Sequence, residues 1–403
     1  MKKIWDKWTR IALVKRILVG LILGAILGIA VPQATGIAIL GDVFVSALKA
    51  IAPLLVFFLV ISSLCNAGKS HGGVIKTVII LYMFSTVLAA VIAVFASMAF
   101  PVKMTLANAA TDTSAPQGIV EVLNNLLLNV VANPVSSLVN ANYVGILMWA
   151  VLLGLAFRAA DKMTKKVLAD VADGISMVVT WIINLAPFGI FGLVFNTVST
   201  NGLDIFTTYG KLLLLLVGCM LFIYFVTNPL LVYWCIRQNP YPLIFQCLKR
   251  SALTAFFTRS SAANIPVNMK VCEEMGLDRD TYSVTIPLGA TINMDGAAIT
   301  ITVMTMATAF TLGIHVDIPT AIILSLLAAL SACGASGVAG GSLLLIPMAC
   351  SLFGISDDIS MQVVAVGFII GVVQDSVETA LNSSSDLLLS ASAEFRQWRL
   401  EGK

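Results

Sequence analysis

Charged residues are scarce in this chain of 403 residues. Asp, Glu, Lys and Arg make up 11% of it, against roughly 25% in a typical soluble domain. Hydrophobic residues make up 59%, and the mean hydropathy is +0.96. So few charges cannot cover a water-facing surface, which excludes an ordinary soluble protein. The net charge of +3 is also too small and scattered for a nucleic-acid-binding surface.

Histidines and paired cysteine motifs are lacking as well. The two histidines, His71 and His315, are too few for a His-rich metal site or a histidine-based catalytic triad. The seven cysteines form no CxxC pair, and all except Cys272 lie in apolar runs, where we expect small buried hydrophobes. Gly68-Lys69-Ser70 resembles the end of a phosphate loop, but Ser63 stands where its first glycine belongs, so ATP is not the expected energy source.

What the sequence has instead is long uncharged runs. A spanning helix needs about 20 apolar residues. The first run follows a basic, amphipathic start at 1–16; it is too long for a signal peptide and lacks a clear cleavage site, so we expect an uncleaved transmembrane helix. The run 122–157 is interrupted at Asn133-Pro134 and Asn140–Asn142 and is expected to be one broken span. The eight predicted spans lie near 17–31, 42–67, 76–100, 122–157, 174–197, 205–236, 282–313 and 361–390.

Two further apolar segments are predicted to be re-entrant hairpins. Residues 240–275 have two arms around the polar tip Thr258–Ser261, and residues 319–352 are broken by the glycine-rich stretch Cys333–Ser342. Each arm of the second segment has roughly 12–14 residues, or about 20 Å of helix, which is too short to cross a bilayer. Irregular tips of this kind are tolerated only where they line a cavity.

The distribution of basic residues supports this topology. With the N-terminus in the cytoplasm, 20 of the 24 Lys and Arg residues fall on the cytoplasmic side. A full crossing by either hairpin would place Arg396, Arg399 and Lys403 outside. We therefore expect both termini in the cytoplasm. The hairpins then enter from opposite sides and each precedes a polar helix, the inverted arrangement that points to a transporter site.

Acidic side chains within apolar spans are the strongest functional signal, because each costs a few kcal/mol at the bilayer centre. The helix 361–390 carries Asp375, Glu378 and Asp386, and Thr379 and Asn382 share one face with the two aspartates. Such a stripe of oxygens suits an alkali cation or a bound ammonium group. The alternative is a polar seam between helices, although three carboxylates exceed what a seam requires.

Two more charged residues stand in unusual places. Asp295 lies near Gly289 and Gly296, which suggests unwound backbone whose carbonyls coordinate a cation; a simple kink is the alternative. Arg259 lies at a hairpin tip beside two serines. Three roles are open for it: pairing with a membrane carboxylate, holding the tip, or solvation in a loop.

At these residues the chain resembles the dicarboxylate/amino acid:cation symporter family. The resemblance covers essentially the whole chain, and it implies the glutamate-transporter-like fold: an all-α polytopic membrane protein with eight transmembrane helices, two opposed re-entrant helical hairpins and inverted repeats. The motifs that carry it are Arg259-Ser260-Ser261, Asn293-Met294-Asp295-Gly296, the glycine-rich second tip and Asp375…Thr379…Asn382…Asp386.

The resemblance also implies a domain organisation. A mobile transport domain slides against a scaffold within a homotrimer embedded in the lipid bilayer, here the bacterial inner membrane. Residues 1–236 would be mainly scaffold and trimerisation helices, with the helix near 76–100 joining the transport domain. Residues 237–392 would form the transport core, and 393–403 a cytoplasmic tail.

By the same resemblance, individual positions acquire roles. Asp375 corresponds to the residue that takes the substrate ammonium, and Asn382 to the one that takes the α-carboxylate. The rest of the substrate site would be Ser261, Val338, Ser342, Glu378 and Thr379. One sodium site would use Asn293, Asn382, Asp386 and the Gly289 carbonyl, a second the backbone carbonyls of Thr291, Ala332, Cys333 and Ala335, and a third Asp295, Asn293, Tyr82, Ser85 and Thr86.

Two departures from the family pattern predict the substrate. Members that carry acidic amino acids have an arginine at the position of Glu378 and a threonine at that of Ala297. An arginine would clamp a side-chain carboxylate, whereas a glutamate would repel it. The expected activity is import of small neutral amino acids, serine and threonine first, with Na⁺ as coupling ion and no cofactor.

Other functions were weighed against this one. A sodium- or proton-coupled symporter of acidic amino acids or dicarboxylates is the nearest alternative, and Glu378 and Ala297 argue against it. An intramembrane enzyme would usually need a GxGD-type motif or a histidine; no such motif appears, and His71 and His315 are expected in loops, so the protein is not expected to be an enzyme. A passive channel would not need a single-occupancy residue such as Asp375.

Overall fold

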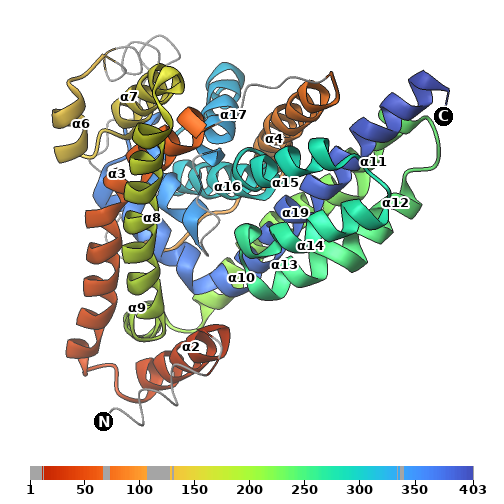
Figure 1. Ribbon diagram of the computed structural model, residues 1–403. Helices are drawn as coiled ribbons and strands as arrows, with labels where there is room; N and C mark the ends of the chain where they lie inside the picture. Colours follow the sequence, from red (N-terminus) through yellow and green to blue (C-terminus); the bar gives the residue numbers. More distant parts are fainter. Residues whose placement is uncertain are drawn as a thin grey trace.

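The computed structural model describes residues 11, 13–66, 73–106, 128, 131–333, 335 and 340–402. Within these residues the regular secondary structure consists of helices, without strands (Figure 1). Several helices are long and apolar enough to cross a membrane, as expected of an all-α polytopic membrane protein. Six such stretches are Thr35–Asn66, Gly73–Ala99, Lys162–Asn184, Phe206–Ile236, Arg279–Thr311 and Asp357–Glu401.

One group of helices packs together on the left of Figure 1. Helix α2 lies along α9, and α3 contacts α7, α8 and α9. The short helix α6 begins at an Asn133 cap with Pro134 in its first turn, and Asn142 caps α7, so the interruption predicted at 140–142 is confirmed. The bounds are α2 Leu13–Ala30, α3 Ile39–Asn66, α6 Pro134–Val139, α7 Tyr143–Ala156, α8 Lys162–Asn184 and α9 Ala186–Asn201, with 3₁₀ turns η1 Thr35–Ala38 and η2 Phe157–Ala159.

A second group surrounds the long helix α19, which contacts α4, α10, α11 and the later helices. Two stretches in it are π-helical, η3 and η4, and η5 is a 3₁₀ turn. The bounds are α4 Gly73–Ala99, α10 Asp204–Phe222, η3 Ile223–Thr227, α11 Asn228–Ile236, α12 Tyr241–Cys247, η4 Leu248–Ala252, α13 Leu253–Thr258, α14 Ser261–Glu274, α15 Arg279–Ile292, α16 Asp295–Thr311, α17 Ile318–Ala332, η5 Gly341–Leu345, α18 Ile346–Ser351 and α19 Asp357–Glu401.

Three predicted spans differ from the structure in their continuity. The span 174–197 is two helices that meet at Leu185, since Pro187 lies in the first turn of α9. The span 282–313 is also two helices, because Asn293 and Met294 leave the helical conformation. The last helix is longer than expected: it runs to Glu401 and takes in most of the segment predicted to be a tail.

Both predicted hairpins contain paired helical arms. In the first, α12, η4 and α13 run to Arg259, which adopts a left-handed conformation at φ 52°, and α14 then packs back on α13 (Figure 1). In the second, α17 is followed by η5 and α18, and residues 334 and 336–339 lie outside the described residues. The start of the 122–157 span and most of the basic segment 1–16 also lie outside them. That the arms are re-entrant stays a prediction.

The two groups of helices are joined by an ion pair near the start of α19. Lys49 of α3 lies 3.1 Å from an Asp357 carboxylate oxygen and 2.7 Å from an Asp358 oxygen. The lysine side chain is 39% exposed. This pair therefore lies at the surface of the single chain, and Lys49 itself belongs to the predicted span 42–67.

Glycines bring α2 into close contact with α9. Gly20, Gly24 and Gly28 recur every four residues on α2. A Cβ atom on Gly20 would lie 2.2 Å from the Pro187 carbonyl oxygen, and one on Gly24 would lie 2.6 Å from the Phe191 carbonyl oxygen. Small residues at this spacing let two helix backbones approach each other.

We expect Gly24→Ala to destabilise the protein by about 1–3 kcal/mol, because the added methyl group must push the two helices apart. Thermal unfolding in detergent measures the effect. Gly218→Ala on α10 is the control, since a Cβ there meets nothing within 4 Å and alanine favours the helix. An unchanged melting temperature for Gly24→Ala would contradict the close approach.

Candidate functional site

The polar stretch of α19 from Asp375 to Asp386 forms the centre of the site. Asp375, Glu378 and Asp386 are each at most 5% exposed, and Asp295 at the start of α16 is completely buried. Carboxylates withdrawn from solvent need hydrogen bonds, ion pairs or bound cations. The contacts of each one therefore indicate what it can bind.

Asp375 is held by the tips of both hairpin segments. Arg259 Nε donates to one carboxylate oxygen at 2.6 Å, and the backbone N–H of Gly340 donates to the other at 3.1 Å. The guanidinium also reaches the Gly371 carbonyl oxygen at 3.4 Å. Of the three roles left open for Arg259, the structure selects pairing with a carboxylate inside the helical bundle.

Glu378 lies one turn after Gln374 on α19. One of its carboxylate oxygens accepts from the Thr300 hydroxyl at 2.7 Å and from the Ser342 hydroxyl at 2.9 Å. The Gln374 side-chain amide donates to the same oxygen. Hydroxyl and amide groups therefore surround this carboxylate, without an arginine or lysine paired to it in the described residues.

Asn382 faces the point where α15 and α16 separate. Its side-chain oxygen accepts from the backbone N–H of Gly296 at 2.7 Å, and its amide nitrogen lies 3.5 Å from the Met294 sulfur. A Cβ on Gly296 would lie 2.9 Å from the Glu378 Cα atom. Glycine is therefore needed here so that the start of α16 can reach Asn382.

Asp386 and Asn293 form the polar core of the first expected sodium site. Asn293 Nδ2 donates to Asp386 at 2.9 Å and to the Ser385 hydroxyl at 2.8 Å, while its buried Oδ1 has no hydrogen-bond partner in the described part of the chain. A Cβ on Gly289 would lie 2.7 Å from the Asp386 carboxylate. Carboxylate and amide oxygens are ligands that hard cations prefer.

The residues expected to form the third sodium site do not all lie together in the structure. Ser85 and Thr86 on α4 donate to the two Asp295 carboxylate oxygens at 2.7 and 3.1 Å. Tyr82 contacts Asp386 instead: its hydroxyl donates to the Asp386 backbone carbonyl at 2.9 Å and lies 2.7 Å from the Ser390 hydroxyl. The short Tyr-x-x-Ser-Thr spacing therefore correctly placed two of its three side chains beside Asp295.

Three of the four residues whose backbone carbonyls would form the second expected sodium site lie at the C-terminal end of α17. The Cys333 sulfur lies 3.6 Å from the Ile292 carbonyl, so this end of α17 reaches the residue after Thr291. The Ala332 carbonyl accepts from the Ala335 N–H at 2.8 Å. The structure thus brings the two segments that hold this set next to each other.

The remaining residues of the expected substrate site differ in where the structure places them. Ser261 is the first residue of α14 and is buried. The Thr379 hydroxyl donates to the Asp375 backbone carbonyl at 2.7 Å and so stays on its own helix. Val338 lies outside the described residues.

Two asparagines that sequence reasoning missed connect α14 to the centre of the site. Asn264 Nδ2 donates to the Ser251 and Ser383 hydroxyls at 2.9 and 2.8 Å, and Asn268 Nδ2 donates to the Ser383 carbonyl at 2.8 Å. Ser383 directly follows Asn382. The sequence feature that could have revealed them is a pair of asparagines four residues apart, which places both amides on one face of the helical arm.

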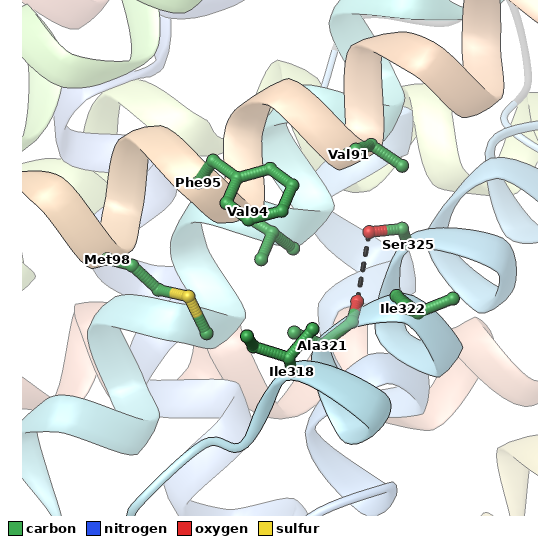
Figure 2. A pocket seen from close by; sticks show the side chains of 8 residues that line it. All are labelled: Val91, Val94, Phe95, Met98, Ile318, Ala321, Ile322 and Ser325. Atoms are coloured by element: carbon green, nitrogen blue, oxygen red, sulfur yellow. Dashed lines mark hydrogen bonds between the residues drawn. The ribbon is translucent and has the colours of Figure 1, made fainter.

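An apolar pocket between α4 and α17 has a different chemistry (Figure 2). Its one hydroxyl, that of Ser325, donates to the Ala321 carbonyl at 2.9 Å. The lining therefore offers no free polar group to a zwitterion, and the polar site on α19 is the better candidate. The lining residues are Val91, Val94, Phe95, Met98, Ile318, Ala321, Ile322 and Ser325.

Comparison with known proteins identifies the family and the relatives of this chain. The sodium:dicarboxylate symporter family matches residues 13–394. The chain is 58% identical over 399 residues to the serine/threonine transporter SstT of Bifidobacterium adolescentis, covering 99% of this chain and 93% of the relative. It is 55% identical over 400 residues to the protein of the same name from Streptococcus thermophilus, covering 99% and 100%.

We expect Arg259→Gln to lower stability by about 3–5 kcal/mol, because it leaves the buried Asp375 carboxylate without its partner. Asp375→Asn should have a similar effect by stranding the guanidinium. The double variant should lose less than the sum of the two, since neither charge is then unpaired. Thermal unfolding in detergent measures all three.

The control for this cycle is Arg250→Gln. Arg250 pairs with Glu274, but its side chain is 45% exposed, so the loss should stay below about 1 kcal/mol. Strictly additive effects of Arg259→Gln and Asp375→Asn would show that the buried pair is not energetically coupled.

Proposed function

Because the chain belongs to the sodium:dicarboxylate symporter family, we propose that it is a sodium-coupled symporter of small neutral amino acids, serine and threonine first. The names of its relatives support this substrate class. The observation that carries the proposal is Glu378, a buried carboxylate in contact with hydroxyl and amide groups, at the position where acidic-substrate members have an arginine. A second substrate carboxylate would meet like charge there.

The zwitterionic part of the substrate would bind between the hairpin tips and α19. Asp375 is the acceptor for the ammonium group, which would share or replace the contact now made by Arg259. Asn382 would hold the α-carboxylate, and its amide nitrogen has only the weak acceptor Met294 sulfur within reach. Ser261, Val338, Ser342 and Thr379 complete the proposed site.

Sodium would bind where acidic and amide oxygens lack cationic partners. No lysine or arginine in the described part of the chain forms an ion pair with Asp386 or Asp295. The unpartnered Asn293 Oδ1 beside Asp386 supports one site. The second comprises the carbonyls of Thr291, Ala332, Cys333 and Ala335. Asp295 with Ser85 and Thr86 supports the third, and the contacts of Tyr82 favour assigning it to Asp386.

Transport would follow alternating access, with the helices around α19 moving against α2, α3 and α7–α9. The contacts of α4 with α16, α17 and α19 support its place in the moving unit. Contacts of α10 and α11 with α19 support including 204–236 as well, instead of a boundary at 236. The homotrimer, the bacterial inner membrane and the cytoplasmic position of both termini stay predictions.

Purified protein in liposomes should take up labelled serine only with an inward Na⁺ gradient. We expect Asp386→Asn to abolish this dependence or to shift it to much higher Na⁺ concentrations, because a dehydrated cation needs the carboxylate. Asp317→Asn is the control: Asp317 caps α17, and asparagine caps helices equally well. Unchanged Na⁺ dependence in Asp386→Asn would make Asp386 a structural residue.

Aspartate and glutamate should neither enter nor compete with serine. An ionised Glu378 at about 4 Å from a second carboxylate would cost on the order of 4 kcal/mol at an effective dielectric constant near 20, roughly a thousandfold in affinity. Glu378→Arg, alone or with Ala297→Thr, should weaken serine uptake and begin to admit aspartate.

The control for this charge reversal is Glu273→Arg at an exposed position of α14, which should leave the substrate preference unchanged. Inhibition of wild-type serine uptake by micromolar aspartate would favour the alternative function, a symporter of acidic amino acids or dicarboxylates.

A further inference from the structure

Two residues outside the expected site complete a hydrogen-bonded cluster around Glu378. Gln374 and Thr300 are both fully buried. Gln374 Nε2 donates to the Thr300 hydroxyl at 2.7 Å and also to Glu378, which in turn accepts from Thr300 at 2.7 Å. Ser342 adds a third donor to the same glutamate oxygen.

The orientation of the Gln374 amide is fixed by this network. Its NH₂ group meets the Glu378 carboxylate, which accepts hydrogen bonds and, when ionised, cannot donate them. Turning the amide around would place its oxygen against the carboxylate oxygen. For an ionised Glu378, the assignment of Nε2 and Oε1 therefore follows from these contacts.

This orientation leaves hydrogen-bond acceptors without donors. Gln374 Oε1 is buried and has no hydrogen-bond partner among the residues that the structure describes. All three donors to Glu378 converge on Oε2, and its other oxygen accepts no hydrogen bond within the described residues. Buried polar atoms are normally satisfied, and a buried acceptor left unpaired is unfavourable. The cluster therefore has capacity for one more donor.

The cluster lies next to the group proposed to bind the substrate ammonium. Gly340 donates to Asp375, and two residues later Ser342 donates to Glu378, so one short stretch before α18 bridges the two carboxylates. Asp375 also directly follows Gln374. A small amino acid bound by its ammonium at Asp375 would thus have its side chain near this cluster.

We propose that Gln374 and Thr300, together with Glu378, form a subsite that selects a substrate side chain bearing a hydroxyl group. The substrate O–H donates to the free Gln374 or Glu378 oxygen, and Thr300 holds both acceptors in place. This proposal rests on the proposed function, since it refines which neutral amino acids are carried. Serine and threonine satisfy the acceptors, whereas alanine and 2-aminobutyrate leave them unpaired.

The wild-type protein provides the first test, by competition against labelled serine uptake in proteoliposomes. 2-Aminobutyrate carries a methyl group in place of the serine hydroxyl. We expect it to compete about tenfold more weakly than serine, because it leaves a buried acceptor without a hydrogen bond. Equal competition by serine and 2-aminobutyrate would overturn the proposal, whereas absence of serine uptake would overturn the proposed function itself.

Variants then assign the selectivity to residues. Gln374→Met and Thr300→Val should reduce the ratio of kcat/KM for serine to that for alanine about tenfold, mainly through loss of serine uptake. Thr300→Ser, which keeps the hydroxyl, should keep the ratio. The matched control is Thr302→Val on the same helix, since the Thr302 hydroxyl is buried and has no hydrogen-bond partner.

A merely structural role gives a different result. If Gln374→Met and Thr300→Val lower serine and alanine uptake equally, or leave the ratio at its wild-type value, the cluster does not select the hydroxyl group. Should a variant fail to fold, the competition by 2-aminobutyrate in the wild-type protein still decides the question.

Discussion

Burial of negative charge is the constraint on which the rest of this structure depends. Asp295, Asp375, Glu378 and Asp386 lie inside a bundle of apolar helices, where an uncompensated charge is very unfavourable. Asp375 has a guanidinium, whereas Glu378, Asp295 and Asp386 have neutral hydroxyl or amide donors only. Asp295 and Asp386 therefore have carboxylate oxygens that a cation can bind, which is the basis of the proposed coupling to sodium.

Breaks in the helical backbone allow polar groups to reach these buried carboxylates. The helix break at Asn293 and Met294 frees the Gly296 N–H for Asn382 and directs the Asn293 amide at Asp386. Glycines at 289 and 296 are required because any side chain there would collide with α19. The hairpin turn at Arg259 likewise directs its side chain to Asp375. Departures from regular helix therefore occur where polar groups of separate elements must meet.

Much of this arrangement could be predicted from the sequence, because the signals are local. Hydrophobic runs located most of the helices, and Asp295 between two glycines predicted the unwound segment. The sequence alone could not predict which carboxylate pairs with Arg259, because several carboxylates were within reach of a hairpin tip. Gln374 was overlooked because the spacing on one helix does not reveal what the neighbouring helix presents, here Thr300. Tyr82 was assigned to the Asp295 site, although it contacts Asp386 on α19, for the same reason.

The ion pair between Lys49 and the start of α19 has a consequence for how the protein samples its conformations. Its side chains are partly exposed, and an exposed pair contributes at most about 1 kcal/mol. That amounts to roughly a fivefold change in the ratio of two populations, enough to bias one arrangement of the helix groups and too little to lock it. Where water reaches the pair, dissolved salt screens it over about 10 Å, so any balance between arrangements of the two helix groups would shift with ionic strength.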